Sequence, residues 1–234
     1  MDRSVALAQV ARSLTAAGHA CRVSDARYVG RVAGGAVFEA GCIDGPGYLV
    51  IDGGRSAAVV SCEEAWAAAF TSPGRAPECT LPGNGGHADR LRRRAREAGV
   101  MCRIDQAQPV GRTRDGMLYE IGCDGEDGFL LSGGGDLRAK PCLEATTQGE
   151  TTGCRFTTRR EQIASLQAAL PGDGPCTITQ FRFMGTGDGG RYHQLACASG
   201  EDRILRRSPD GTHSDAPCSE SMGMGLSCAR PEGQ

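Results

Sequence analysis

One spacing pattern occurs three times in this chain and constrains its fold more than any other feature. A cysteine is followed nine residues later by a glycine, and twelve residues after that by a second cysteine. The copies run from Cys21 to Cys42, from Cys102 to Cys123 and from Cys176 to Cys197. Three matching copies of Cys-x8-Gly-x11-Cys indicate an internal repeat. We therefore divide the chain into three repeat units, which span residues 1–79, 80–154 and 155–234.

Each repeat begins with a helical pattern and continues with short strand-like segments. Apolar residues at helical spacing predict helices over residues 4–17, 86–98 and 160–170, and glycine or Pro-Gly follows each one. Alternating segments between glycine-rich turns predict strands. They cover residues 28–32, 37–42, 48–51, 109–113, 117–123, 128–132, 177–184, 191–198 and 202–206, with a possible extra strand at 22–23. The predicted fold is α+β, with three tandem repeats that each pack a helix on a small antiparallel sheet of three to four strands.

Between the first two repeats, residues 63–80 form a connector. Its first part predicts a short helical turn, and the Pro/Gly-rich remainder predicts a loop. Trp66, the single tryptophan, lies in this segment. We expect Trp66 to pack against a neighbouring repeat rather than to bind a ligand.

The twelve cysteines fall into groups of four, one group for each repeat. An even count in each repeat predicts a disulfide framework, for which four cysteines allow three connectivities. Disulfides would also stabilise units whose cores are too small to be secure alone. We favour bonds from first to second and from third to fourth cysteine, because Cys123 should point inward with Tyr119 and Ile121, close to Cys102 at the helix end. The groups are Cys21, Cys42, Cys62 and Cys79; Cys102, Cys123, Cys142 and Cys154; and Cys176, Cys197, Cys218 and Cys228.

A disulfide framework places the protein in an oxidising compartment, so we expect a periplasmic or extracellular location. The N-terminal segment lacks the apolar region of a signal peptide, so we expect a mature or excised fragment whose signal sequence is absent here. No apolar run is long enough to span a membrane. The net charge of −2 gives no general attraction to nucleic acid or to an anionic membrane.

Motifs for catalysis and for cofactors are weak throughout the sequence. The glycine-rich run at residues 185–190 occupies a hairpin-turn position and no helix follows it, so it does not predict a phosphate-binding loop. The cysteines lack the close pairs of a zinc or redox site. The four histidines are scattered, and we predict that only His193 lies on the inward face of a strand. We therefore predict no catalytic residues, no metal ligands and no cofactor.

Two groups of residues are candidates for binding a partner. Glu39, Glu120 and Gln194 share one repeat position, which we predict on the outward face of the middle strand, and the glutamine argues against a required catalytic carboxylate. This face either packs on a neighbouring repeat, binds a partner or faces solvent.

The second group lies in the predicted arginine-rich helix at residues 86–98. Arg92, Arg93 and Arg96 form either a solvated helix face or a site for an anionic envelope polymer or an acidic partner.

The repeat pattern, with VGR, YEIGC and GYLV in its strands, resembles disulfide-rich tandem-repeat exported proteins of alphaproteobacteria, a group without an established activity. The order of helix, cysteine, strands and second cysteine is also similar to beta-lactamase inhibitor protein, where residues such as Cys21 and Cys42 take equivalent places. That resemblance implies protein binding across tandem sheets, although three units replace two. We expect a non-enzymatic protein-binding or assembly module, which binds a protein partner or its own copies. The alternatives are an inhibitor of a secreted enzyme and a small hydrolase-like enzyme.

Overall fold

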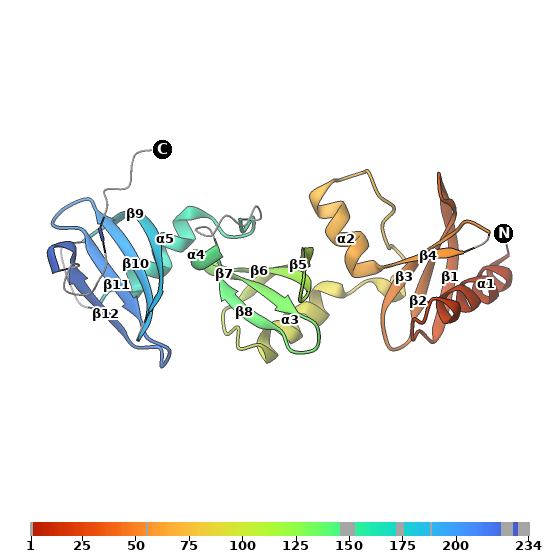
Figure 1. Cartoon of the computed structure of the whole chain (residues 1–234), viewed down its shortest axis with the longest axis horizontal. Coiled ribbons are helices and arrows are strands. Elements are labelled where there is room, and N and C mark those ends of the chain that lie inside the picture. The colour runs from red at the N-terminus through yellow and green to blue at the C-terminus, as the bar shows by residue number, and fades with distance from the viewer. Residues whose placement is uncertain are drawn as a thin grey trace. The chain divides into compact units, whose positions relative to one another are not determined.

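A computed structural model describes residues 2–54, 56–145, 153–171, 176–187, 189–220 and 227–228. In these residues the chain forms three four-stranded antiparallel sheets, one in each repeat (Figure 1). Strands within every sheet follow each other in sequence order, which defines a simple meander. The predicted α+β class with three tandem repeats is confirmed. Contacts divide the chain into two compact units, and the second sheet has residues in both. The domain boundaries given above stay a prediction.

The helices and strands repeat in the same order. The first repeat contains α1 (Arg3–Ala16), β1 (Val23–Val32), β2 (Gly35–Cys42), β3 (Gly45–Asp52), β4 (Ala57–Ser61) and α2 (Cys62–Thr71). The second contains the short 3-10 helix η1 (Pro82–Asn84), α3 (His87–Glu97), β5 (Ile104–Thr113), β6 (Gly116–Cys123), β7 (Glu126–Gly133), β8 (Arg138–Pro141) and α4 (Cys142–Ala145). The third contains α5 (Arg159–Ala169), β9 (Ile178–Gly187), β10 (Gly190–Cys197), β11 (Arg203–Arg207) and β12 (His213–Pro217).

Two details of the first repeat differ from the sequence-based expectation. Its fourth strand is β4, which pairs with β3 from Asp52↔Ala57 to Tyr48↔Ser61. The predicted strand at residues 22–23 is wrong, because Val23 is the first residue of β1 itself. The predicted helical turn is the longer helix α2, which Ser61 begins with a capping box to Glu64. Such a reciprocal cap satisfies two backbone donors and favours a full helix over a turn.

All six disulfides join first to second and third to fourth cysteines, as predicted. Cys123 is buried together with Tyr119 and Ile121. Because disulfides persist where thiols are not kept reduced, the framework indicates an oxidising environment outside the cytoplasm. In the described part of the chain, no helix is long and apolar enough to cross a membrane.

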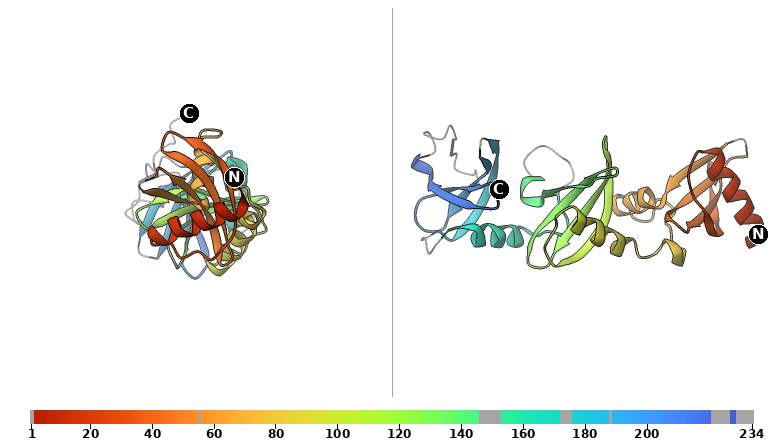
Figure 2. Two further views of the ribbon diagram at one scale, coloured as in Figure 1. Left: turned by 90° about the vertical axis from the view of Figure 1, so that its right-hand side faces the viewer. Right: turned by 90° about the horizontal axis from the view of Figure 1, so that it is seen from below.

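Helices cover both faces of the first sheet. Helix α1 lies against one face (Figures 1 and 2), where its Val10 and Leu14 belong to the same core as Phe38 and Val50. On the other face, α2 packs Trp66 and Ala65 against Val37 and Leu49. The face that we predicted to point outward is therefore covered by the connector, since residues on both sides of β2 are buried. A three-layer repeat buries more apolar surface than a helix on one side of a sheet, which stabilises a unit of this size.

Candidate functional site: the junctions between repeats

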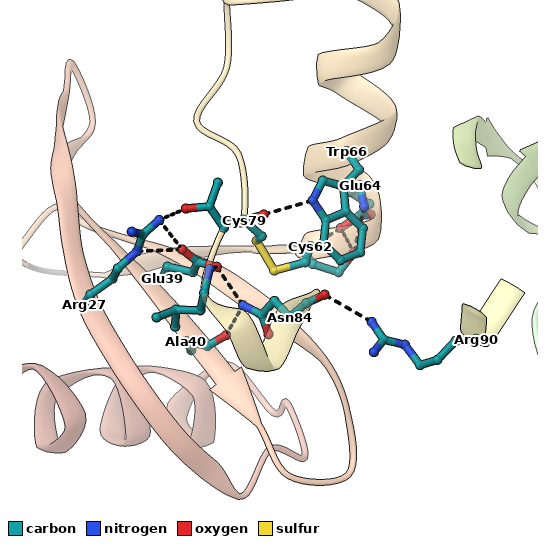
Figure 3. Close-up of a disulfide and its surroundings, with 12 residues drawn as sticks. Arg27, Glu39, Ala40, Cys62, Glu64, Trp66, Cys79, Asn84 and Arg90 are labelled. Carbon is teal, nitrogen blue, oxygen red and sulfur yellow. Dashed lines mark hydrogen bonds and ion pairs between the residues drawn. A yellow bond between two sulfur atoms is a disulfide. The ribbon is translucent and has the colours of Figure 1, made fainter. Parts of the chain in front are cut away.

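The first repeat holds a carboxylate beneath its connector. Glu39 on β2 is fully buried, and its Oε1 accepts hydrogen bonds from the Leu81 amide at 2.6 Å and from Asn84 Nδ2 at 2.8 Å (Figure 3). Its Oε2 accepts from Arg27 Nε at 2.9 Å. A buried charge is tolerated when it is paired and fully hydrogen-bonded. Glu39 therefore fixes the chain that leaves the first repeat onto the sheet.

Glycines at one repeat position allow the connector to approach the sheet. A Cβ atom on Gly47 would lie 1.9 Å from the Ala40 carbonyl oxygen and 2.3 Å from Asn84 Oδ1. A Cβ atom on Gly128, the matching residue of the second repeat, would lie 2.3 Å from Thr157 Oγ1. The Gly128 amide donates to this Thr157 oxygen at 3.0 Å. In both repeats, glycine is required because the segment after the fourth cysteine crosses the sheet there.

The third repeat keeps a related contact. Arg182 stands at the position of Arg27, and its Nη2 donates to Gln194 Oε1 at 2.8 Å and to the Ser227 carbonyl at 3.2 Å. Ser227 directly precedes the fourth cysteine, Cys228. In the first repeat Arg27 pairs with Glu39, and in the third repeat Arg182 pairs with Gln194. Each pair holds the chain close to the fourth cysteine of its repeat.

The connector helix α2 also contacts the second repeat, and we call this contact the first junction. Tyr119 Oη on β6 donates to Glu63 Oε2 at 2.8 Å and accepts from Arg94 Nη1 at 3.2 Å. Glu64 forms an ion pair with Arg112 of β5. The Trp66 ring stacks on His87 of α3 with ring centroids 4.2 Å apart, while Trp66 Nε1 donates to the Cys79 carbonyl at 3.1 Å. The prediction that Trp66 packs on a neighbouring repeat is confirmed.

Burial and charge shift the titration of groups at the first junction. Burial, with the nearby Glu63 carboxylate, raises the pKa of Tyr119 to about 12. Burial raises the pKa of Glu64, but hydrogen bonds from Ser61 and the charge of Arg112 outweigh it and leave that pKa below its usual value. Burial lowers the pKa of His87. Tyr119 thus stays a hydrogen-bond donor and Glu64 an anion over the physiological pH range.

The connector helix α4 contacts the third repeat, and we call this contact the second junction. Leu143 is fully buried in the core that Leu166 of α5, Phe181 of β9 and Leu205 of β11 form. Glu144, also buried, forms an ion pair at 3.2 Å with Arg191 of β10. An apolar residue and a glutamate of one repeat therefore insert into the next.

Asp127 on β7 adds a buried carboxyl group to the second junction. Its Oδ2 accepts from the Leu143 amide at 3.1 Å, and its own amide donates to Ser165 Oγ of α5 at 2.7 Å. Burial raises the pKa of Asp127 to about 7, although the Leu143 hydrogen bond and the charge of Arg207 oppose this shift. Burial also raises the pKa of Glu144, which the Arg191 charge partly offsets.

His193 is the other unusual group near the second junction. It is fully buried and packs against Phe183, with ring centroids 5.2 Å apart. Burial and then the charges of Arg207 and Arg191 lower its pKa to about 3. Neither ring nitrogen has a hydrogen-bond partner among the described residues. His193 is therefore a neutral core residue in this structure, shielded from any substrate in solution.

The structure places the candidate binding residues in two different environments. Glu39, Glu120 and Gln194 are buried, so a partner does not reach them while the connector is in place. Arg92 is half-buried and donates to Asp89 Oδ1 at 2.8 Å. Arg93 and Arg96 are exposed on α3. Among these candidates, only the last two arginines present free charge to solvent.

Sequence reasoning missed the junction residues Glu63, Glu64, Asp127 and Glu144. A signal for two of them was present, because a glutamate stands two residues after the third cysteine in every repeat, as Glu64, Glu144 and Glu220. No family model, curated protein or solved structure matches the chain. The functional argument therefore rests on the geometry of the junctions.

Proposed function

We propose that the protein is a non-enzymatic, disulfide-stabilised repeat protein of the periplasm or the cell exterior that acts as a protein-binding or assembly module. The proposal is supported by the use of buried polar groups. Glu39 holds the connector, Glu63 and Glu64 hold the first junction, and Glu144 holds the second. Ionisable groups at an active site must reach a substrate, whereas these groups link one part of the chain to another.

The observation that carries the proposal is an exposed apolar strip on the edge strand β1, formed by Tyr28 and Val29. Tyr28 is 47% exposed, and the matching Phe183 of the third repeat is 8% exposed. Val29 is 36% exposed, whereas the matching Val110 of the second repeat is 4% exposed. The second and third repeats each receive a connector helix. An apolar strip at positions buried elsewhere in the chain is typical of a surface that binds another protein.

Affinity capture tests the proposal. The immobilised protein, kept oxidised, is incubated with secreted and envelope fractions of the source cells, and bound proteins are crosslinked and mapped by mass spectrometry. We expect crosslinks to a protein at β1, and their loss in Val29→Glu. Ile43→Glu is the matched control, because Ile43 is also exposed but follows Cys42, at the end of the sheet away from Val32.

Capture that persists unchanged in Val29→Glu would contradict binding at this strip. If the captured protein is a secreted enzyme and its activity falls on binding, the module acts as an inhibitor. If the purified protein instead turns over a substrate, and His193→Ala leaves it folded but inactive, the non-enzymatic proposal fails.

A further inference from the structure

A glutamate in the third repeat continues the series of glutamates that form the two junctions. In the two junctions described above, the glutamate two residues after the third cysteine pairs with an arginine of the next repeat. Glu64 pairs with Arg112 and Glu144 pairs with Arg191. The third member of this series is Glu220. It is exposed at the end of the third repeat and has no partner among the described residues.

The backbone around Glu220 resembles the start of the other connectors. Residues 218–220 form a short 3-10 turn directly after β12, as α2 follows β4 and α4 follows β8. The Cys218 amide donates to the Asp202 carbonyl at 2.8 Å, and the Ser219 amide donates to Glu201 Oε1 at 2.8 Å. Glu220 is thus presented from an ordered position rather than from a free tail.

The first repeat carries the matching receptor. Arg31 stands ten residues after Cys21, as Arg112 stands ten residues after Cys102. It is exposed, with no partner among the described residues. Arg31 lines a cleft of about 420 Å³ with Val32, Ala36 and Asp52, next to the apolar strip of Tyr28 and Val29. A guanidinium beside apolar side chains is suited to a carboxylate on a helical turn.

A second cleft fits the aromatic part of the first junction. In that junction, Trp66 stacks on His87, and His87 Nε2 lies 3.4 Å from Gln108 Oε1. The matching residues of the first repeat are Ala6 and Arg27, fifteen residues before and six residues after the first cysteine. Both line a cleft of about 480 Å³, with Tyr28 beside them. The first repeat therefore has an open cleft at the position where the first junction has its aromatic contact.

We propose that copies of this chain associate head to tail, with the third-repeat segment Cys218–Glu220 of one copy docking on the β1 face of the next copy and Glu220 pairing with Arg31. This inference rests on the proposed assembly function and names its partner as a second copy. The evidence is charge complementarity between two exposed groups, a glutamate position that pairs with an arginine of the next repeat at both junctions, and an arginine that matches Arg112 of the first junction. The two surfaces differ, so the contact is heterologous and adds further copies until a ring closes or a chain grows.

Charge reversal tests this pairing by sedimentation velocity over a range of concentrations in oxidising buffer. We expect the wild-type mass to rise with concentration. Arg31→Glu and Glu220→Arg should each weaken association by about tenfold or more, because each places like charges together. The double variant Arg31→Glu/Glu220→Arg should restore association. Arg93→Glu is the control, since Arg93 is an exposed arginine on α3 away from the proposed contact, and it should associate like the wild type.

A wild-type protein that stays monomeric at about 1 mM, a concentration at which even weak association with Kd near 1 mM is detectable, would overturn the inference. Association that both single reversals leave unchanged would also overturn it, because a different surface would then be responsible. Neither result affects the proposed function if affinity capture finds a different protein on β1. Failure of both experiments would instead count against the proposed function itself.

Discussion

The two junctions follow one plan but use different chemistry. At the first, Glu63 accepts a hydrogen bond from Tyr119, and the groups around it are partly exposed. At the second, the residue matching Glu63 is Leu143, which inserts into the core of the third repeat. The residue matching Tyr119 is His193, which has no hydroxyl to donate and packs against Phe183. A polar pair in one junction is thus replaced by apolar packing in the other.

This difference indicates how the repeats tolerate sequence change. The disulfides and the glycines at positions such as Gly47 and Gly128 fix the path of the connector. Because the path is fixed, the residue directly after the third cysteine contacts the next repeat at both junctions, as Glu63 at the first and as Leu143 at the second. Apolar burial contributes more free energy than a partly exposed hydrogen bond. The second junction should therefore be the stronger of the two.

The largest expected effect is that of Leu143→Ala. Removing a fully buried leucine leaves a cavity and should lower the free energy of unfolding of the third repeat by about 2–5 kcal/mol. Urea denaturation followed by circular dichroism measures the change. Ile43→Ala is the matched control, because Ile43 is exposed and its truncation leaves no cavity. If the two variants lose equal stability, the second junction does not depend on apolar packing.

The next effect is a change in pH dependence at the second junction. The folded pKa of Asp127 is about 7, above its ordinary value, so ionising this carboxyl costs folding free energy as pH rises from about 4 to 7. Asp127→Asn keeps an oxygen for the Leu143 amide and removes that cost. The variant should gain roughly 1–3 kcal/mol over the wild type at pH 8, since one pKa unit is about 1.4 kcal/mol.

At pH 4 the wild-type carboxyl is protonated, so the two proteins should be equally stable there. Urea unfolding at both pH values measures the difference. The contribution of His193 runs in the opposite direction, because its lowered pKa means that stability is lost as pH falls from about 6.5 to 3. The wild type and Asp127→Asn both contain His193, so its contribution cancels when their stabilities are compared. A gain that does not vary with pH would show that Asp127 is not a titrating group of this junction.

A smaller effect is expected from Tyr119→Phe at the first junction. The substitution removes the hydroxyl that donates to Glu63 and accepts from Arg94, and it keeps the buried ring. The loss of stability should be about 1 kcal/mol, measured by the Trp66 fluorescence change on urea unfolding. Tyr48→Phe is the control, because Tyr48 contacts His19 through its ring. A loss as large as that of Leu143→Ala would remove the contrast between the junctions.

The smallest effect is that of the ion pair between Glu64 and Arg112. The Arg112 side chain is largely exposed, so its coupling to Glu64 should be about 0–1 kcal/mol and should decrease in high salt. A double-mutant cycle with Glu64→Gln and Arg112→Gln, measured in low and high salt, gives this coupling. A large coupling that salt does not change would mean that the pair is shielded from solvent.

Features set by short-range patterns were predictable from the sequence. Apolar residues at helical spacing located α1, α3 and α5. The inward position of Cys123 beside Tyr119 and Ile121 gave the disulfide pairing that the structure has. The covering of the second sheet face was not predictable, because burial of Glu39 depends on Asn84 and Leu81, more than forty residues away. A glutamate in a strand ordinarily indicates a solvent-exposed face. Long-range hydrogen bonds reversed that expectation here.

Strand β4 escaped prediction for a related reason. Its five residues, Ala57–Ser61, are mostly small and form the edge of the sheet. Ala57, Ala58 and Ser61 carry little strand propensity, and the turn before them contains Gly54, whose φ is 87°. At the junctions, the sequence contained the repeated glutamate after the third cysteine, but only the fold identifies its partners Arg112 and Arg191.

Connector helix α4 belongs energetically to the third repeat, because its Leu143 inserts into the core of that repeat. Native-state hydrogen exchange of Leu143→Ala tests this claim most directly, because it resolves where protection is lost. We predict faster amide exchange in β9, β10 and β11 of the third repeat, with little change in β5 and β6 of the second. Loss of protection confined to the second repeat, with β9, β10 and β11 unchanged, would contradict the claim.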